Sequence, residues 1–184
     1  MARKPKPPVE RVRNGFRINL QAEERDLIQR LMAELRSLLT ESAGPENPGP
    51  ENSGPENSSD DRLRRIFPTA YHQAGDREMD QEYQRLMRED LVTSRLKGID
   101  LVDECLDSAG RNSAQLSEGE MMAFVQALNG VRLVLGTMLD VDEEHDLDEV
   151  SEDHPLVGEY HLYAFLSWVL DWSIRALQGP QGWE

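Results

Sequence analysis

Hydrophobic residues recur at steps of three and four along most of this chain, which is the spacing of helices rather than strands. The first such stretch runs from about residue 22 to residue 41, with apolar residues at Leu27, Ile28, Leu31, Leu35, Leu38 and Leu39. A second begins at Gly75-Asp76 and continues to Ala109-Gly110. Gly98 or the Thr93-Ser94 pair is a candidate break within it, because these residues weaken helical structure.

The segment LSEGEM, residues 116–121, carries the clearest local signal for the start of a helix. The Ser117 hydroxyl can accept a hydrogen bond there while Glu120 reaches back, which is the reciprocal capping box. We expect the helix to begin at Glu118. Its apolar side is formed by Met121, Phe124, Leu128, Val131, Leu135, Met138 and Leu139.

The C-terminal stretch predicts another helix, started by Pro155 because proline is tolerated in the first turn. Residues 156–177 are apolar nearly all round, with Trp168 and Trp172 on one side and leucines on another. A helix that is apolar on every side belongs in the middle of a bundle. We therefore expect this last helix to be central and both tryptophans to be buried.

Two charged residues fall on or beside these apolar faces. Arg132 lies at the flank of the apolar side of the helix that begins at Glu118, and Asp171 lies between two apolar stripes of the last helix. An unpaired, partly buried guanidinium would cost about 3–5 kcal/mol. We expect Arg132 to have a carboxylate neighbour, and Asp171 to pair with Arg132 or with Arg175 one turn on.

The segment RVRNGFRINL, residues 11–20, predicts a β-hairpin. Asn14-Gly15 tolerates the positive φ angles of a two-residue type I′ turn, and such a turn places Arg11 opposite Ile18. One face of the ribbon is then apolar and consists of Phe16, Ile18 and Leu20. Because an isolated two-stranded ribbon is marginal in water, we expect this face to pack on the helices.

Between the first two helical stretches lies a tract of low complexity, GPENPGPENSGPENSSDD, in which GPEN occurs three times. Glycine and proline prevent regular structure here, and the tract has too little apolar surface to offset the cost of ordering. We expect residues 42–60 to form a disordered loop. The whole chain, residues 1–184, then forms a single mainly α domain, a helical bundle of about five helices with a central C-terminal helix and an N-terminal β-hairpin.

The chain is strongly acidic, with 35 acidic residues against 20 basic ones and a net charge of −15. Repulsion from phosphate argues against a general binder of polyanions. Residues 1–20 are the exception, since they hold one acid, Glu10, and six bases, namely Arg3, Lys4, Lys6, Arg11, Arg13 and Arg17. This basic arm is a candidate contact for DNA or an acidic protein partner. A tail that pairs with the acidic body or stays in water explains the same charges.

Candidate catalytic or metal-binding residues are sparse. The run from Asp140 to His154 holds nine carboxylates, but it lacks the glycine and the glutamate that an EF-hand loop places at its sixth and twelfth positions. The sequence contains no Glu-x-x-His motif, no nucleophile elbow and no phosphate-binding glycine loop. His161 stands alone on an apolar helix, which is typical of a core histidine. We therefore expect no enzymatic activity, no metal and no cofactor.

Cys105 is the only cysteine of the chain. A single cysteine excludes an intrachain disulfide and a zinc knuckle, and it is typical of a protein of the reducing cytoplasm. The neighbouring acids Asp103, Glu104 and Asp107 should raise the pKa of its thiol, which disfavours a redox sensor. No apolar stretch follows the N-terminal bases, and polar residues interrupt the last helix, so we expect neither export nor a membrane span.

Several segments together resemble the actinobacterial AosR-like family, long catalogued as a domain of unknown function. They follow the basic ribbon and read RLRRIFPTAY, EYQRLMREDL, LSEGEMMAFVQALNGVRLVLGTML and HLYAFLSWVLDWSIRAL. The resemblance covers most of the chain but not the GPEN tract. It implies an all-helical cytoplasmic protein with an N-terminal ribbon, encoded near the Clp protease adaptor and acting as an oxidative stress regulator with the transcription machinery.

The single cysteine departs from what the resemblance implies. The redox device attached to the family's regulator label is an intramolecular cysteine switch, which requires two cysteines. Either Cys105 pairs between molecules or the redox input is lost here.

We therefore expect a non-enzymatic, transcription-associated regulator that acts through protein–protein contacts in the oxidative stress response. DNA contact through the basic arm is a second expectation, weakened because the acidic body opposes the salt-sensitive attraction of six bases. An adaptor or accessory protein in Clp-type regulated proteolysis is the alternative function, and it rests on the family's gene neighbourhood.

Overall fold

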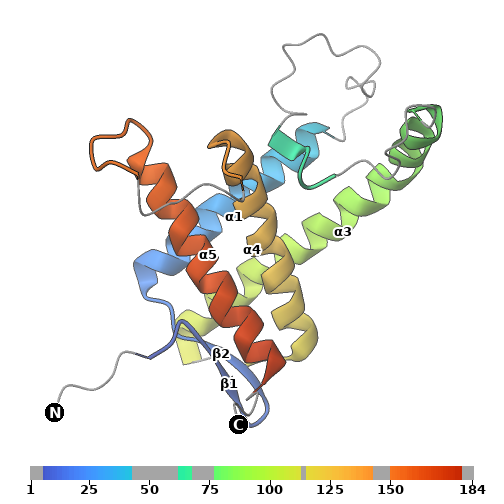
Figure 1. Cartoon of the computed structure of the whole chain (residues 1–184). Coiled ribbons are helices and arrows are strands. Elements are labelled where there is room, and N and C mark those ends of the chain that lie inside the picture. The colour runs from blue at the N-terminus through green and yellow to red at the C-terminus, as the bar shows by residue number, and fades with distance from the viewer. Residues whose placement is uncertain (1–5, 43–61, 68–76, 113–114, 143–149, 180–184) are drawn as a thin grey trace, which may run out of the picture.

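The computed structural model describes residues 6–42, 62–67, 77–112, 115–142 and 150–179. Within these residues the chain forms four helices and a small three-stranded sheet (Figure 1). The helices are α1 (Ala22–Ser42), α3 (Arg77–Asn112), α4 (Glu118–Met138) and α5 (Val157–Gln178). The strands are β1 (Val9–Val12), β2 (Gly15–Ile18) and β3 (Gln115–Leu116). The fold is mainly α, as predicted.

The number of helices is lower than expected, because the second helical stretch is not divided. α3 runs without interruption for 36 residues, past Thr93-Ser94 and Gly98. A glycine inside a helix costs only about 1 kcal/mol relative to alanine. Val92, Ile99 and Val102 continue one buried face across the candidate break. Packing along this face therefore outweighs the local weakness.

The central helix is α4, not the C-terminal helix. α4 contacts α1, α3, α5 and two strands, whereas α5 packs mainly on α4 and β1. In Figure 1, α4 and α5 run side by side, and α1 and α3 pass obliquely behind them. Trp168 of α5 is 45% exposed, so the prediction that both tryptophans are buried is wrong. An all-round apolar pattern fits a central helix, but it fits equally a surface helix with an uncovered apolar face.

α4 is also the helix that, among the described residues, is long and apolar enough to cross a membrane by length and composition alone. Half of that apolar stretch is buried inside the fold, with Phe124 and Leu128 fully buried. The buried face of α4 thus belongs to the core of the fold. Its start agrees with the sequence, because Ser117 is the N-cap and forms both hydrogen bonds of a capping box with Glu120.

The N-terminal hairpin forms, but its register differs from the expected one. Arg11 lies opposite Phe16 rather than Ile18, and the turn residues are Arg13-Asn14. Gly15 has a φ of 142°, and a Cβ there would collide with the carbonyl oxygen of Leu116. The glycine therefore allows β3 to approach closely and to pair with β2. The hairpin pattern in the sequence does not reveal this third strand.

The apolar face of the ribbon is buried, as expected, by contact with α5 and α4. It consists of Phe16, Ile18 and Leu20. The expected disordered loop, residues 42–60, lies outside the described residues except for Ser42, the last residue of α1. After that tract, Leu63 and Ile66 are buried, and Arg65 donates a hydrogen bond to the carbonyl of Val141 at 2.7 Å. These contacts attach residues 62–67 to the core.

Candidate functional site

The six bases of the basic arm have different environments. Arg3 and Lys4 lie outside the described residues, and Lys6 and Arg13 are exposed. Arg11 donates a hydrogen bond to the carbonyl of Leu177 at 3.1 Å, and its guanidinium lies 5.5 Å from the centre of the Phe16 ring. Arg17 pairs with Glu10 at 3.3 Å. Arg11 thus contacts the C-terminal helix, and Arg17 is paired within the arm itself.

The expected ion pair between Arg132 and Asp171 is not among the ion pairs of the described residues. Asp171 instead pairs with Arg175 at 2.9 Å, the second of its two predicted partners. The Nε of Arg132 donates to the Ser167 hydroxyl at 2.8 Å, and its guanidinium lies 4.8 Å from the centre of the Tyr163 ring. A hydroxyl and an aromatic face stabilise this partly exposed cation without a carboxylate.

Cys105 of α3 is buried. Burial raises the pKa of its thiol to about 11, and the negative charges of Glu120 and Glu104 add to the effect. A thiol is reactive in its ionised form, so a raised pKa lowers its reactivity at neutral pH. The environment of Cys105 is thus the opposite of the environment that makes a cysteine reactive.

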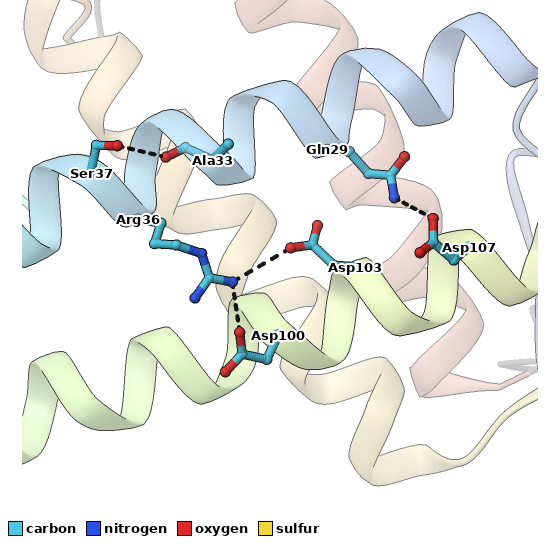
Figure 2. A network of polar contacts seen from close by, with 7 residues as sticks. All are labelled: Gln29, Ala33, Arg36, Ser37, Asp100, Asp103 and Asp107. Carbon is cyan, nitrogen blue, oxygen red and sulfur yellow. Dashed lines mark hydrogen bonds and ion pairs between the residues drawn. The ribbon is translucent and has the colours of Figure 1, made fainter.

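A polar network joins α1 to α3 on the surface (Figure 2). Arg36 of α1 reaches Asp100 at 2.7 Å and Asp103 at 3.5 Å, and Gln29 donates to Asp107 at 2.8 Å. Burial raises the pKa of the Asp103 carboxyl, although Arg36 opposes that effect. Surface pairs of this kind contribute about 0–1 kcal/mol each. The network links the two helices at the surface, and its residues do not form an arrangement typical of catalysis.

A groove of about 490 Å³ opens between α1, α4 and the first turns of α5. Aliphatic side chains of all three helices line it, including Leu31, Leu35, Leu38, Val134, Met138 and Leu162. The charged residues at this groove are Glu34, Glu41, Glu159 and Arg62. Its volume falls in the range of ligand-binding sites, and the floor offers contact area rather than polar groups. This is the concave surface on which we base a binding role.

Sequence reasoning did not predict this groove. The periodicity placed Met138 on the apolar side of α4 together with core residues, yet Met138 is 57% exposed. A periodic pattern gives the face of a helix but not whether a neighbouring element covers it. Leu139, the next residue of the same stripe, is buried, so the stripe alone did not distinguish these two positions.

An aromatic surface lies on the outer side of α5. Phe165 and Trp168 are in ring contact, with centroids 6.2 Å apart, and Arg175 lies 5.9 Å from the centre of the Trp172 ring. His161 is exposed on the same helix, so the expectation of a core histidine is wrong. His161 and Trp168 are seven residues apart on α5 and therefore lie on the same side of the helix. Partly exposed aromatic rings of this kind are common at protein interfaces.

Among the described residues, no three side chains of histidine, cysteine, aspartate or glutamate lie close enough to hold a metal ion. Residues 143–149 of the acidic run, which include His145, lie outside the described residues. What the described surface offers is therefore a groove and an aromatic face, both suited to binding.

Comparisons with known proteins give the chain a family. The model of a domain of unknown function, DUF2017, matches residues 6–177. A stretch of 87 residues is 28% identical to the proteins named Oxidative stress regulator AosR from Mycobacterium bovis and from two strains of Mycobacterium tuberculosis. That stretch covers 47% of this chain and 38% of those relatives, so the match spans less than half of their length. No solved structure matches the chain at a significant level. The chain thus belongs to the DUF2017 family, and its resemblance to the AosR-like proteins is confirmed.

Proposed function

We propose that this protein is a non-enzymatic cytoplasmic regulator of the oxidative stress response, associated with transcription and acting through protein–protein contacts. The observation that carries the proposal is the 28% identity over 87 residues to proteins named Oxidative stress regulator AosR. The apolar groove and the exposed aromatic face of α5 support binding as the mode of action, because contiguous apolar surface marks interaction sites.

In this proposal, the redox signal does not enter through Cys105. The thiol is buried and its pKa is raised to about 11, so oxidants that attack thiolates react with it slowly. A second cysteine for an intramolecular switch does not exist in this chain. The regulator would therefore respond to a partner whose own state changes with oxidation.

The test compares transcripts in the native organism with and without peroxide. A deletion of the gene should change the peroxide response of a set of transcripts, and the wild-type gene should restore it. A Cys105→Ala gene should restore it equally, because the proposal gives the thiol no sensing role. Unchanged peroxide-responsive transcripts in the deletion strain would refute the proposed function.

Direct DNA binding is the less supported form of this function. Arg11 and Arg17, two of the four described bases in the arm, already have partners within the protein, and the chain carries a net charge of −15. Titration of labelled duplex DNA with the full chain separates the two forms. We expect no saturable binding at about 50 mM salt, where phosphate contacts are strong. Saturable binding that weakens steeply with added salt would favour the DNA form.

A further inference from the structure

The groove between α1, α4 and α5 has the dimensions of a site for a short helix. The apolar residues that line it run from Leu31 to Leu38 on α1 and from Val131 to Met138 on α4. Each pair is seven residues apart, which corresponds to about 10 Å along a helix. An amphipathic helix that binds in a groove uses apolar anchors at positions i, i+3 or i+4, and i+7, which cover the same length.

The charges at the groove indicate which kind of helix fits. Glu34 and Glu41 lie seven residues apart on α1, and Glu159 stands on α5, across the groove. Arg62 is the one basic residue among the described residues that line it. Three carboxylates beside an aliphatic floor favour lysine and arginine at the flanks of the incoming helix, since complementary charge selects partners and speeds encounter.

Other occupants fit less well. A small polar ligand or cofactor would need convergent polar groups to orient it, and the floor of the groove is aliphatic. Apart from four prolines, residues 43–61 contain no apolar side chain larger than alanine, so this segment has no aliphatic or aromatic anchors for the groove. A second copy of the chain would bring a net charge of −15 against the acidic rim.

We propose that this groove binds an amphipathic helix of a partner protein, with three apolar anchors spaced over two turns and basic residues on its flanks. The proposal rests on the proposed function, because it identifies the class of partner through which the regulator acts. The partner helix would place its apolar side chains beside Leu35 and Met138 and its bases beside Glu34 and Glu41.

The test uses a synthetic probe and the full chain. The probe is a fluorescein-labelled 15-residue peptide with leucine at the three anchor positions and lysine or arginine on both flanks. A peptide of the same composition in scrambled order controls for non-specific charge attraction. A peptide with glutamate in place of the bases tests the charge argument. We expect saturable binding of the first peptide, at least tenfold tighter than that of either control.

Two methionines of α4 form a matched pair for the protein side of the experiment. Met138 lines the groove and is 57% exposed, whereas Met122 lies outside it and is 50% exposed. Met138→Lys should weaken peptide binding at least tenfold, and Met122→Lys should leave it within about twofold. Because both residues are exposed, both variants should retain the helical circular dichroism of the wild type.

A charge reversal at the rim completes the design. The double change Glu34→Lys and Glu41→Lys should weaken binding of the basic peptide and strengthen binding of the acidic one. Glu89→Lys, at an exposed position of α3, is the control. Equal binding of the three peptides, or equal loss in Met138→Lys and Met122→Lys, would overturn the proposal. So would sedimentation that shows a wild-type dimer which Met138→Lys converts to a monomer, because the occupant would then be a second copy.

The outcomes separate this proposal from the proposed function. If no peptide binds but deletion of the gene still changes the peroxide response, the regulatory function stands and the groove is not its contact surface. If the peptide binds and deletion leaves the response unchanged, the groove is a docking site and the oxidative stress function is wrong.

Discussion

The guanidinium of Arg11 donates a hydrogen bond at 3.1 Å to the carbonyl of Leu177, which lies 166 residues further along the chain. Leu177 belongs to the last turn of α5, where carbonyl groups have no partner within the helix and the helix dipole favours a cation. The same guanidinium lies over the ring of Phe16. One basic side chain of the ribbon thus joins the N-terminal hairpin to the end of the C-terminal helix.

We expect Arg11→Gln to destabilise the fold by about 1 kcal/mol, the magnitude of a hydrogen bond plus a favourable dipole contact at the surface. Arg13→Gln removes the same charge from an exposed position in the turn and should change stability by less than about 0.5 kcal/mol. Urea unfolding followed by circular dichroism measures both. Equal midpoints for the two variants would mean that the contact with Leu177 contributes nothing to stability.

The capping box of α4 gives a pH dependence with a definite sign. A backbone hydrogen bond from Ser117 lowers the pKa of Glu120 below its ordinary 4.5. A lowered pKa means that the ionised carboxylate stabilises the fold above the unfolded pKa, and that this contribution is lost as the pH falls through the folded pKa. Glu120→Ala should therefore cost about 1 kcal/mol at pH 7 and much less near pH 3. Unfolding curves at both pH values check this.

Glu120→Gln separates the hydrogen bond from the charge. Glutamine can form the same reciprocal bond but does not titrate. Its stability relative to Glu120→Ala should stay nearly constant between pH 3 and pH 7. If the wild type and Glu120→Ala differ by the same amount at both pH values, the lowered pKa has no bearing on stability.

Two glycines in helix interiors are expected to respond in opposite ways to alanine. A Cβ at Gly136 of α4 would lie 3.0 Å from the Tyr163 ring and 3.2 Å from the Arg65 guanidinium, whereas a Cβ at Gly98 of α3 would meet nothing within 4 Å. Gly98→Ala should stabilise the protein by about 0.5–1 kcal/mol through helix propensity. Gly136→Ala should destabilise it, because overpacking costs about 1–3 kcal/mol and exceeds that gain. Thermal unfolding of both variants measures the difference.

The thiol of Cys105 should react slowly with alkylating reagents. Its pKa is raised from 9.0 to about 11, so at neutral pH its thiolate is about 100-fold scarcer than that of an unperturbed cysteine. Iodoacetamide labelling at pH 7.5, followed by mass spectrometry, should be at least that much slower than labelling of glutathione. The same protein in denaturing urea should label at the rate of glutathione. Rapid labelling of the folded chain would show that Cys105 is accessible and ionised.

Local patterns in the sequence determined most of the secondary structure, because the start of a helix and the buried face of a hairpin depend on neighbours within one turn or one strand pair. The capping box placed the first residue of α4 correctly, at Glu118. The alternation of residues 16–20 gave the buried face of the ribbon, although the turn came one residue earlier than expected. The register of the hairpin also depends on β3, which lies outside the hairpin. Gly15 accommodates the backbone of Leu116, about a hundred residues away in the sequence.

Tertiary structure alone decided which apolar face is covered and by what. The sequence makes both α4 and α5 apolar, but only the packing of the helices places α4 at the centre and leaves Trp168 exposed. It also gave Arg132 a hydroxyl and an aromatic ring in place of the expected carboxylate, and it left Met138 at a groove instead of in the core. The physical reason is that burial is a property of pairs of surfaces: a sequence specifies each face, whereas the mutual placement of distant segments determines which faces meet.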